Sequence, residues 1–283
     1  ASDVYKRQLL GLIHPTSGSV RLLGQPLTRE SRLALLRQTG SLIENPAGYL
    51  HLTARENLEI VADLKGVPHK DIARVLDIVQ LTNDQHRKVG QYSLGMKQRL
   101  GVAQALLGEP KLLICDEPTS ALDPLGRKEL LDILRTISAR TTVLFSTHIL
   151  SDVERICDRV ALLNEGKIAV SGDLAALKAR HGQNALRVEF VDAEDLAQLT
   201  VQPAVMPFLA NSKQEGTAMI IESRDIATVQ RTLFGALVET RLSPVKVEIL
   251  EPTLENLFLM CLTTLFFLIV VFDKIFYIAQ KTD

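Results

Sequence analysis

Residues 112–117 read Leu-Leu-Ile-Cys-Asp-Glu, an unbroken apolar run that ends in two adjacent carboxylates. A short apolar run between turn signals is typical of a strand that is buried on both faces of a parallel sheet. Ligand sites in open α/β sheets lie at the carboxyl ends of such strands. We therefore expect Asp116 and Glu117 to lie at a binding site. The alternative is a plain pair of surface acids where a strand leaves the sheet.

The segments on either side of this run alternate between helix and strand. Helical patterns cover 94–107 before it and 125–138 after it, and a second buried strand is predicted at 143–145. A helix over 149–157 and a hairpin over 159–170 follow. Strands that alternate with helices predict an α/β fold with a mostly parallel sheet and helices on its faces.

The character of the sequence changes near residue 180, where runs with strand-like alternation replace the continuous apolar ones. We expect a main α/β domain over 9–180, with a helical subdomain at about 50–107. In that subdomain Thr53 is followed three residues later by Glu56, the signature of a capping box. Residues 183–255 are predicted to form a small α+β accessory domain without a catalytic constellation.

The tail at 257–279 starts with sixteen residues that carry no charge, 257–272. A membrane-spanning helix needs about 20 predominantly apolar residues. One interpretation is a buried or partner-docking helix, or a spurious end of the reading frame. The other is a short segment that spans the membrane or lies on it.

The charge balance and the cysteines exclude several classes of protein. The 32 basic and 33 acidic residues give a net charge of −1, which indicates neither a nucleic-acid partner nor an anionic membrane surface. The three cysteines, Cys115, Cys157 and Cys261, form no C-x-x-C pair. They favour a reduced, cytoplasmic setting over a disulfide framework or a zinc site.

Residues 92–99, Tyr-Ser-Leu-Gly-Met-Lys-Gln-Arg, open the predicted helix at 94–107. The first N–H groups of a helix are free and its N-terminus carries a partial positive charge, an arrangement that suits a phosphate. Ser93 either caps this helix or donates to a phosphate oxygen. The plain cap is the simpler interpretation of the residue taken alone.

His148 follows the second predicted strand and lies 31 residues after Glu117. Because neighbouring parallel strands end at the same edge of a sheet, we expect its imidazole to lie beside the two carboxylates. There it could contact the terminal phosphate of a bound nucleotide. A structural or merely exposed histidine is the alternative.

Taken together, these motifs resemble the nucleotide-binding subunits of ABC transporters over residues 9–260. Residues 92–99 resemble the family's signature L-S-G-G-Q-x-Q-R, and 112–117 resemble its Walker B strand. Ser120–Asp123 resembles the D-loop, and His148 the switch histidine. The resemblance implies a P-loop NTPase-like fold, with 9–180 as the ATPase domain.

The resemblance also implies roles for individual residues. In the family two such domains enclose two ATP molecules, and each ATP contacts the signature of the opposite subunit. Asp116 would coordinate Mg²⁺ and Glu117 would act as the general base. Ser93 and Gly95 would touch the partner's ATP, and the D-loop residue Asp123 is expected to belong to the nucleotide-binding residues as well.

The family resemblance implies an ATPase that drives a separate membrane permease. The expected partners are therefore a second ATPase subunit, in a homodimer or heterodimer, and that permease. The expected location is the cytoplasmic face of the membrane, peripherally bound, with the tail as a possible membrane segment.

Three residues depart from the family pattern. Leu94 stands where the signature has its first glycine, and Met96 where it has glutamine. Glu44 falls in register with the family's loop glutamine, and a glutamate there resembles the bacitracin and lantibiotic transporters of peptide-antibiotic export or immunity. In that setting Glu44 adds negative charge near Mg²⁺ and faces the membrane subunit. A plain loop acid is the alternative.

The largest departure from the family pattern concerns the N-terminal segment, because no G-x-x-x-x-G-K-[ST] run occurs in the chain. In register with the family, Ser2 takes the place of the phosphate-binding lysine. We expect the family's first strand and phosphate loop to be missing, residues 1–8 to be foreign, and both termini to be artefactual. The first hypothesis is therefore an exporter ATPase whose fragment hydrolyses ATP poorly. The second is a degenerate, non-hydrolytic subunit that lends its signature to an intact partner.

Overall fold

The computed structural model describes residues 2–43, 48–164, 166–181, 184–250, 254 and 267–271. The chain divides into two compact units. The first combines Ala1–Leu174 with Thr264–Asp283, and the second is Ala175–Thr263.

The first unit holds the strands and helices that the sequence predicts around residues 112–117. Their bounds agree with the prediction to within two residues, except that the hairpin predicted to end at 170 continues to Asp173. Its elements are α1 (Ser2–Leu9), β1 (Arg21–Leu22), β2 (Gln25–Pro26), α2 (Arg32–Leu36), β3 (Thr39–Leu42), α3 (Ala54–Lys65), α4 (Asp71–Ile78), α5 (Leu94–Leu106), β4 (Leu112–Asp116), α6 (Pro124–Ser138), β5 (Thr142–Thr147), α7 (Leu150–Ile156), β6 (Arg159–Asn164), β7 (Lys167–Asp173) and β12 (Phe267–Val271).

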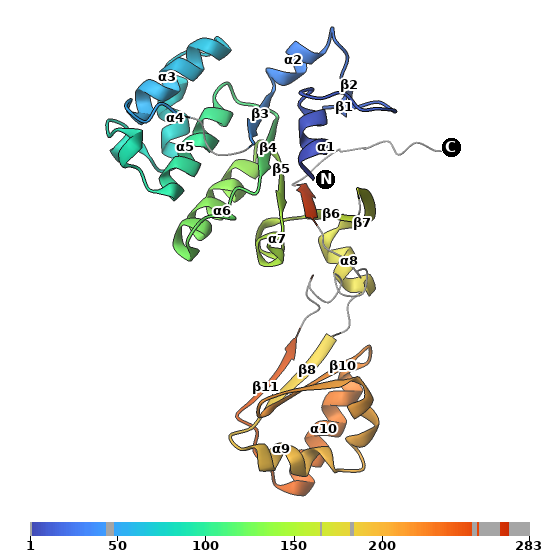
Figure 1. Ribbon diagram of the computed structural model, residues 1–283. Helices are drawn as coiled ribbons and strands as arrows, with labels where there is room; N and C mark the ends of the chain where they lie inside the picture. Colours follow the sequence, from blue (N-terminus) through green and yellow to red (C-terminus); the bar gives the residue numbers. More distant parts are fainter. Residues whose placement is uncertain are drawn as a thin grey trace. The chain divides into compact units, whose positions relative to one another are not determined.

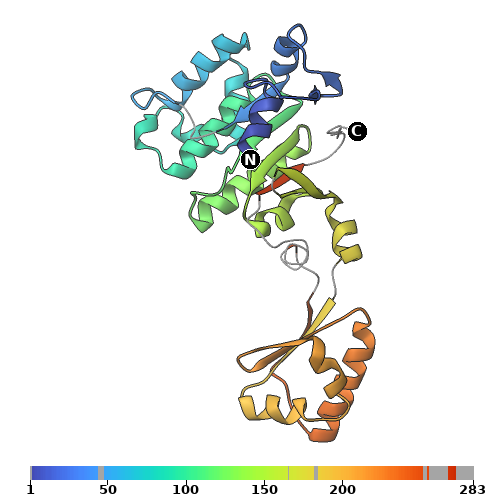
Figure 2. The same ribbon diagram turned by 45° about the vertical axis from the view of Figure 1, so that its right-hand side comes forward.

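A six-stranded sheet in the order β3-β4-β5-β12-β6-β7 forms the centre of this unit. The predicted parallel pairing holds across β3, β4 and β5, where Asp116 pairs with Ser146. The strand β12 then runs antiparallel to both β5 and β6, and β7 is antiparallel to β6 (Figure 2). The sheet therefore joins a parallel half, which carries the carboxylates, to an antiparallel half.

The strand β4 is buried on both faces, as its unbroken apolar run predicts. Leu112 and Ile114 pack on one face with Leu10 and Leu144. Leu113 and Cys115 alternate to the opposite face and are also fully buried. Burial on both faces fixes the end of β4, and hence the position of Asp116.

The helices α3, α4 and α5 lie together beside the β3 edge of the sheet (Figure 1). The predicted capping box starts α3: the Glu56 N–H donates to Thr53 Oγ1, and the Thr53 N–H donates to Glu56 Oε2 at 2.7 Å. A Cβ on Gly40 of β3 would lie 2.4 Å from the Ala105 carbonyl oxygen of α5. Glycine at this position therefore allows α5 to approach the sheet closely.

The second unit is an α+β fold, as predicted for residues 183–255. Its elements, with the helix that leads into it, are α8 (Leu174–His181), β8 (Asn184–Glu189), α9 (Ala193–Thr200), β9 (Ser212–Glu215), β10 (Ala218–Ser223), α10 (Ile226–Thr240) and β11 (Lys246–Leu250). The strands form an antiparallel sheet in the order β11-β8-β10-β9.

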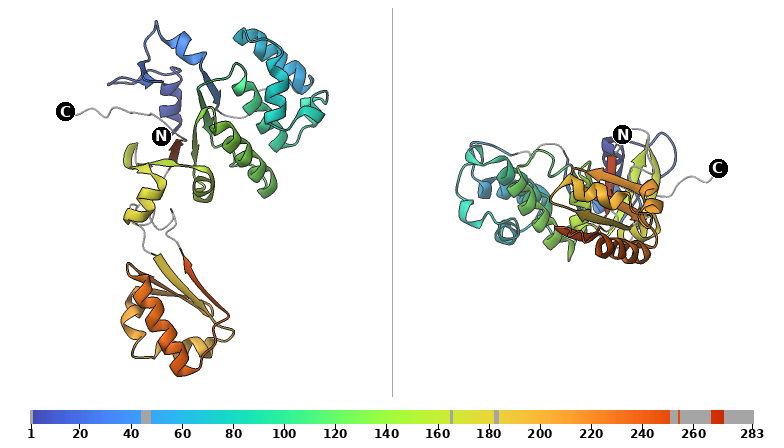
Figure 3. Two further views of the ribbon diagram at one scale, coloured as in Figure 1. Left: turned by 180° about the vertical axis from the view of Figure 1, so that it is seen from behind. Right: turned by 90° about the horizontal axis from the view of Figure 1, so that it is seen from below.

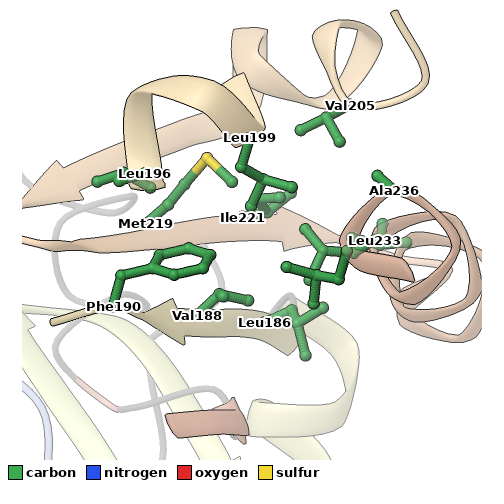
Figure 4. Close-up of a cluster of buried hydrophobic side chains, with 12 residues drawn as sticks. Leu186, Val188, Phe190, Leu196, Leu199, Val205, Met219, Ile221, Leu233 and Ala236 are labelled. Carbon is green, nitrogen blue, oxygen red and sulfur yellow. The ribbon is translucent and has the colours of Figure 1, made fainter. Parts of the chain in front are cut away.

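The helices α9 and α10 cover one face of this second sheet (Figure 3). Side chains from β8, β10 and both helices interdigitate in the core, among them Leu199, Ile221 and Leu233, together with Phe190, which directly follows β8 (Figure 4). This cluster gives the unit a hydrophobic core of its own.

Most of the apolar tail at 257–279 lies outside the described residues. Within it, Phe267–Val271 forms the strand β12 of the first sheet, so the expectation of a helix or membrane segment is wrong for these five residues. No helix among the residues that the structure describes is both long and apolar enough to cross a membrane.

Candidate functional site

The carboxyl ends of β4 and β5 bring Asp116, Glu117 and His148 together, as the sequence predicts. The two strands are parallel neighbours, so the residues that follow them lie at one edge of the sheet. The Glu117 N–H donates to the Ser146 carbonyl at 3.0 Å, which fastens the turn after β4 to β5.

Glu117 and His148 form a close pair at this edge. His148 Nδ1 lies 3.1 Å from Glu117 Oε2, and the side chains are 55% and 27% exposed, respectively. Glu117 has a φ of +41°, in the left-handed region that a residue with a side chain rarely occupies. Such a conformation is typical of functional turns in which the surroundings fix the backbone. The pair can hold and orient a water molecule or a phosphate oxygen in front of it.

Asp116 binds a cation that the sequence did not predict. Its Oδ1 accepts a hydrogen bond from the ammonium group of Lys6 and another, at 2.8 Å, from the hydroxyl of Ser146. Lys6 Nζ also donates to Ser146 Oγ at 2.8 Å. Lys6 and Ser146 are fully buried, whereas 16% of the Asp116 side chain remains exposed.

This arrangement does not fit Mg²⁺ at Asp116. Magnesium binds through carboxylate and other oxygens in near-octahedral geometry and tolerates no ammonium among its ligands. Asp116 Oδ1 is paired with the Lys6 ammonium group instead. No group of three or more acidic, histidine or cysteine side chains in the described ranges is placed to hold a metal ion.

Cys115, next to Asp116, takes no part in this chemistry. Burial, and then the charge of Asp116, raise the pKa of its thiol to about 12. The thiol is therefore neutral at physiological pH and packs as a small apolar group.

The signature segment forms the predicted start of α5. Ser93 is the N-cap, and its Oγ accepts the Met96 N–H at 3.2 Å. Among the residues that the structure describes, none accepts a hydrogen bond from the N–H groups of Leu94 and Gly95, which open this helix. The space beside Gly95 is not crowded. A Cβ added at this residue would lie 3.9 Å from its nearest neighbour, Gly126, which is an ordinary van der Waals distance. The N-terminus of α5 therefore has room for an anion and backbone N–H groups that can donate hydrogen bonds to it.

The segment that follows Glu117 connects the signature helix to the carboxylates. Gln98 Nε2 of α5 donates to the Pro118 carbonyl at 3.0 Å. Asp123 is exposed at the N-cap of α6, and a Cβ on Gly126 would lie 2.8 Å from its Oδ1. Glycine at 126 thus leaves room for the Asp123 carboxylate.

A buried carboxylate that the sequence did not single out anchors this segment. Asp152 of α7 is 3% exposed, and it accepts the Thr119 hydroxyl and Arg127 Nε, both at 2.7 Å. The bonds tie α6, and Thr119 directly before the D-loop, to α7, so they hold both ends of the segment that carries Asp123. Glu44, the remaining predicted site residue, lies outside the described residues.

Ser146 carried a signal that sequence reasoning could have used, and Lys6 did not. A serine directly after the apolar run at 143–145 is a polar side chain inside a buried strand, which requires a hydrogen-bond partner. The partner is Asp116, one strand away. Lys6 in the sequence is an ordinary basic residue of a polar helix, and only the packing of α1 buries it.

The comparisons with known proteins identify the family of this chain. The family described as "ABC transporter" matches residues 6–120. The bacitracin transport ATP-binding protein BcrA of Enterococcus faecalis is 34% identical over 229 residues, which cover 80% of this chain and 73% of that protein. This chain belongs to the ABC transporter ATP-binding family.

Further members of the ABC family are similar over shorter stretches. The BcrA protein of Bacillus licheniformis is 44% identical over 178 residues, 62% of this chain and 58% of that protein. The lantibiotic transport ATP-binding protein SrtF of Streptococcus pyogenes is 44% identical over 161 residues, 56% of this chain and 69% of that protein. Across four of the curated relatives the chain spans 52% to 60% of their length.

A solved structure supports the same ABC-type fold. The chain matches the structure titled "Structure of ATP binding subunit of ABC transporter" with a TM-score of 0.54 and 30% identity. The match covers 63% of this chain and 76% of that one.

Proposed function

We propose that this chain acts as the ATP-hydrolysing subunit of a bacterial exporter and drives a separate membrane permease from the cytoplasmic face of the membrane. The observation that carries the proposal is the Glu117–His148 pair, 3.1 Å apart at the carboxyl edge of the parallel strands. A carboxylate and an imidazole at this edge suit attack of water on a terminal phosphate.

Phosphoryl transfer needs little covalent help from a protein and depends on positioning and electrostatics. In the proposed reaction Glu117 holds the attacking water and accepts its proton. His148 donates to an oxygen of the terminal phosphate. Because the two side chains contact each other, each fixes the orientation of the other.

The proposed partner is a second ATPase subunit whose nucleotide rests on the N-terminus of α5. The free N–H groups of Leu94 and Gly95, together with the exposed Ser93, support this role. Asp123, exposed at the start of α6, would lie near the same contact. Neither feature points to nucleic acid.

The proposed cargo is a peptide antibiotic of the bacitracin or lantibiotic type, in a resistance or immunity system. The printed names of the Enterococcus, Bacillus and Streptococcus relatives support this class. Glu44 would face the permease. Mg²⁺ is expected with the nucleotide, and Asp116 is available to it only when Lys6 has left the carboxylate.

We further propose that the chain alone hydrolyses ATP slowly. Its 283 residues contain no phosphate-cradling glycine and lysine loop, and Lys6 holds Asp116. The same observations favour a second candidate function. In it, the N-terminus of α5 contacts the ATP of an intact partner subunit, and the chain does not hydrolyse ATP in its own site.

The central experiment replaces the part before Leu9 by the corresponding part of the Enterococcus relative and measures phosphate release. We expect ATP hydrolysis that falls by about 10²–10³-fold on Glu117→Gln. Glu194→Gln, the same change at an exposed position of the second unit, is the matched control and should leave the rate unchanged. A chimaera that hydrolyses ATP equally well with Glu117→Gln would refute the proposed role.

A mixing experiment separates the two candidates. The unmodified chain is combined with the intact Enterococcus protein, and ATP-dependent complex formation is followed by light scattering. A complex that hydrolyses ATP, and that Ser93→Arg abolishes, supports the lending role. Hydrolysis by the unmodified chain alone, at the rate of the chimaera, contradicts both the slow-hydrolysis proposal and the second candidate.

A further inference from the structure

We propose that the Lys6 ammonium group serves as the chain's own cation at Asp116 and keeps divalent metal ions off this carboxylate. The biological role of this Lys6–Asp116 pair rests on the proposed function. Metal binding can nevertheless be measured without ATP, so the two proposals can fail separately.

Lys6 is built into the fold through the contacts of its helix. The Tyr5 hydroxyl donates to the Gly166 carbonyl at the β6–β7 turn, and Leu10 lies in the cluster on the face of β4. These contacts hold α1 against the sheet on both sides of Lys6. The lysine therefore reaches Asp116 from a fixed helix rather than from a mobile end.

The ammonium group of Lys6 is buried. Lys6 is 0% exposed, and a charge without water is stable only when it is paired and hydrogen-bonded. Asp116 supplies the opposite charge and Ser146 a hydroxyl oxygen. Ser146 also donates to the same Asp116 oxygen, so each of the three groups is hydrogen-bonded to the other two.

A metal ion and the Lys6 ammonium group would compete for Asp116. A divalent ion at Asp116 Oδ1 would lie within a few ångströms of the ammonium group, and two cations so close in a poorly solvated place repel strongly. The lysine must leave before a metal can enter. Because part of the Asp116 side chain is exposed, removal of the ammonium group opens a path for the ion.

The experiment measures Mn²⁺ binding to the purified full chain by electron paramagnetic resonance, without nucleotide. The variants are Lys6→Met, which keeps length and removes charge, Lys6→Arg, which keeps charge, and Lys6→Met with Asp116→Asn. We expect Lys6→Met to bind Mn²⁺ at least tenfold more tightly than the unmodified chain. Lys6→Arg should bind as the unmodified chain does, and the double variant should lose the gain.

Two results would overturn the proposal. One is a Mn²⁺ site in the unmodified chain that Asp116→Asn removes. The other is a folded Lys6→Met variant, checked by circular dichroism, whose affinity for Mn²⁺ is unchanged.

A second measurement requires no variant to fold. Lysines of the unmodified chain are acetylated under native conditions and quantified by mass spectrometry. Lys6 should react at least tenfold more slowly than the exposed Lys128, and slow reaction should persist in millimolar Mn²⁺. Reaction of Lys6 at the rate of Lys128 would contradict the inference.

Discussion

Glu117 and His148 meet across the ends of two neighbouring parallel strands, with 3.1 Å between Oε2 and Nδ1. If they act as one unit on water and phosphate, Glu117→Gln and His148→Ala should each slow ATP hydrolysis of the chimaera by about 10²–10³-fold. The double variant should be little slower than the slower single one, because groups that act as a unit are not additive. Steady-state phosphate release checks this.

The chain offers a matched control for this pair. His69 Nε2 lies 2.7 Å from Asp63 Oδ1 of α3, and the two side chains form an exposed histidine–carboxylate pair. His69→Ala should leave hydrolysis within about twofold, since exposed pairs contribute little. Multiplicative losses in the Glu117 and His148 double variant would show that the two residues act independently.

A second prediction concerns the thiol of Cys115. With its pKa raised from 9.0 to about 12, this thiol should carry about a thousandfold less thiolate at pH 8 than an ordinary cysteine. In a chain with Cys157→Ser and Cys261→Ser, iodoacetamide should modify Cys115 only as fast as the protein unfolds. Peptide mass spectrometry at rising urea concentration measures this. Rapid modification in native buffer would contradict the burial of β4.

A third prediction concerns pH and Asp71. Burial tends to raise the pKa of this carboxyl, but the hydrogen bonds from Arg74 and the Gly108 N–H outweigh it and lower the pKa below 3.8. A lowered folded-state pKa stabilises the protein above the unfolded value, and this contribution disappears as pH falls through the folded value. Asp71→Asn should therefore cost about 1–3 kcal/mol at pH 7.

The stability difference between the unmodified chain and Asp71→Asn should shrink below about pH 4. Urea denaturation followed by circular dichroism at several pH values gives the two curves. A difference that is the same at pH 7 and pH 3 would show that the charge of Asp71 does not matter.

A fourth prediction tests the close approach of α5 to the sheet. A Cβ at Gly40 would lie 2.4 Å from the Ala105 carbonyl oxygen, so Gly40→Ala should destabilise the first unit by about 1–3 kcal/mol. Gly95→Ala is the control, because its Cβ would meet nothing closer than 3.9 Å. Equal urea midpoints for the two variants would exclude the steric explanation.

The parts of this site that sequence could predict are those that local pattern and strand order determine. The apolar run before Asp116 fixed a buried strand, and parallel order then placed His148 beside Glu117. The cap at Ser93 also follows from local chemistry. These features depend on short segments and on one general rule of sheet topology.

The parts that could not be predicted depend on packing between distant segments. Lys6 reaches Asp116 across 110 positions, and no periodicity of a short polar helix signals such burial. The pairing of β12 with β5 and β6 is likewise a long-range choice. An apolar run at 267–271 suits a strand, a helix or a membrane segment equally well. Its secondary structure is therefore decided by the strands with which it pairs.

The position of β12 between β5 and β6 has a consequence for synthesis on the ribosome. Residues 159–173 emerge about a hundred positions before the strand that joins them to β5. Until 267–271 have left the exit tunnel, β5 and β6 each keep an open row of backbone donors and acceptors, which is a surface prone to pairing with other chains. The nascent protein should therefore depend on holding chaperones until residues 267–271 have emerged.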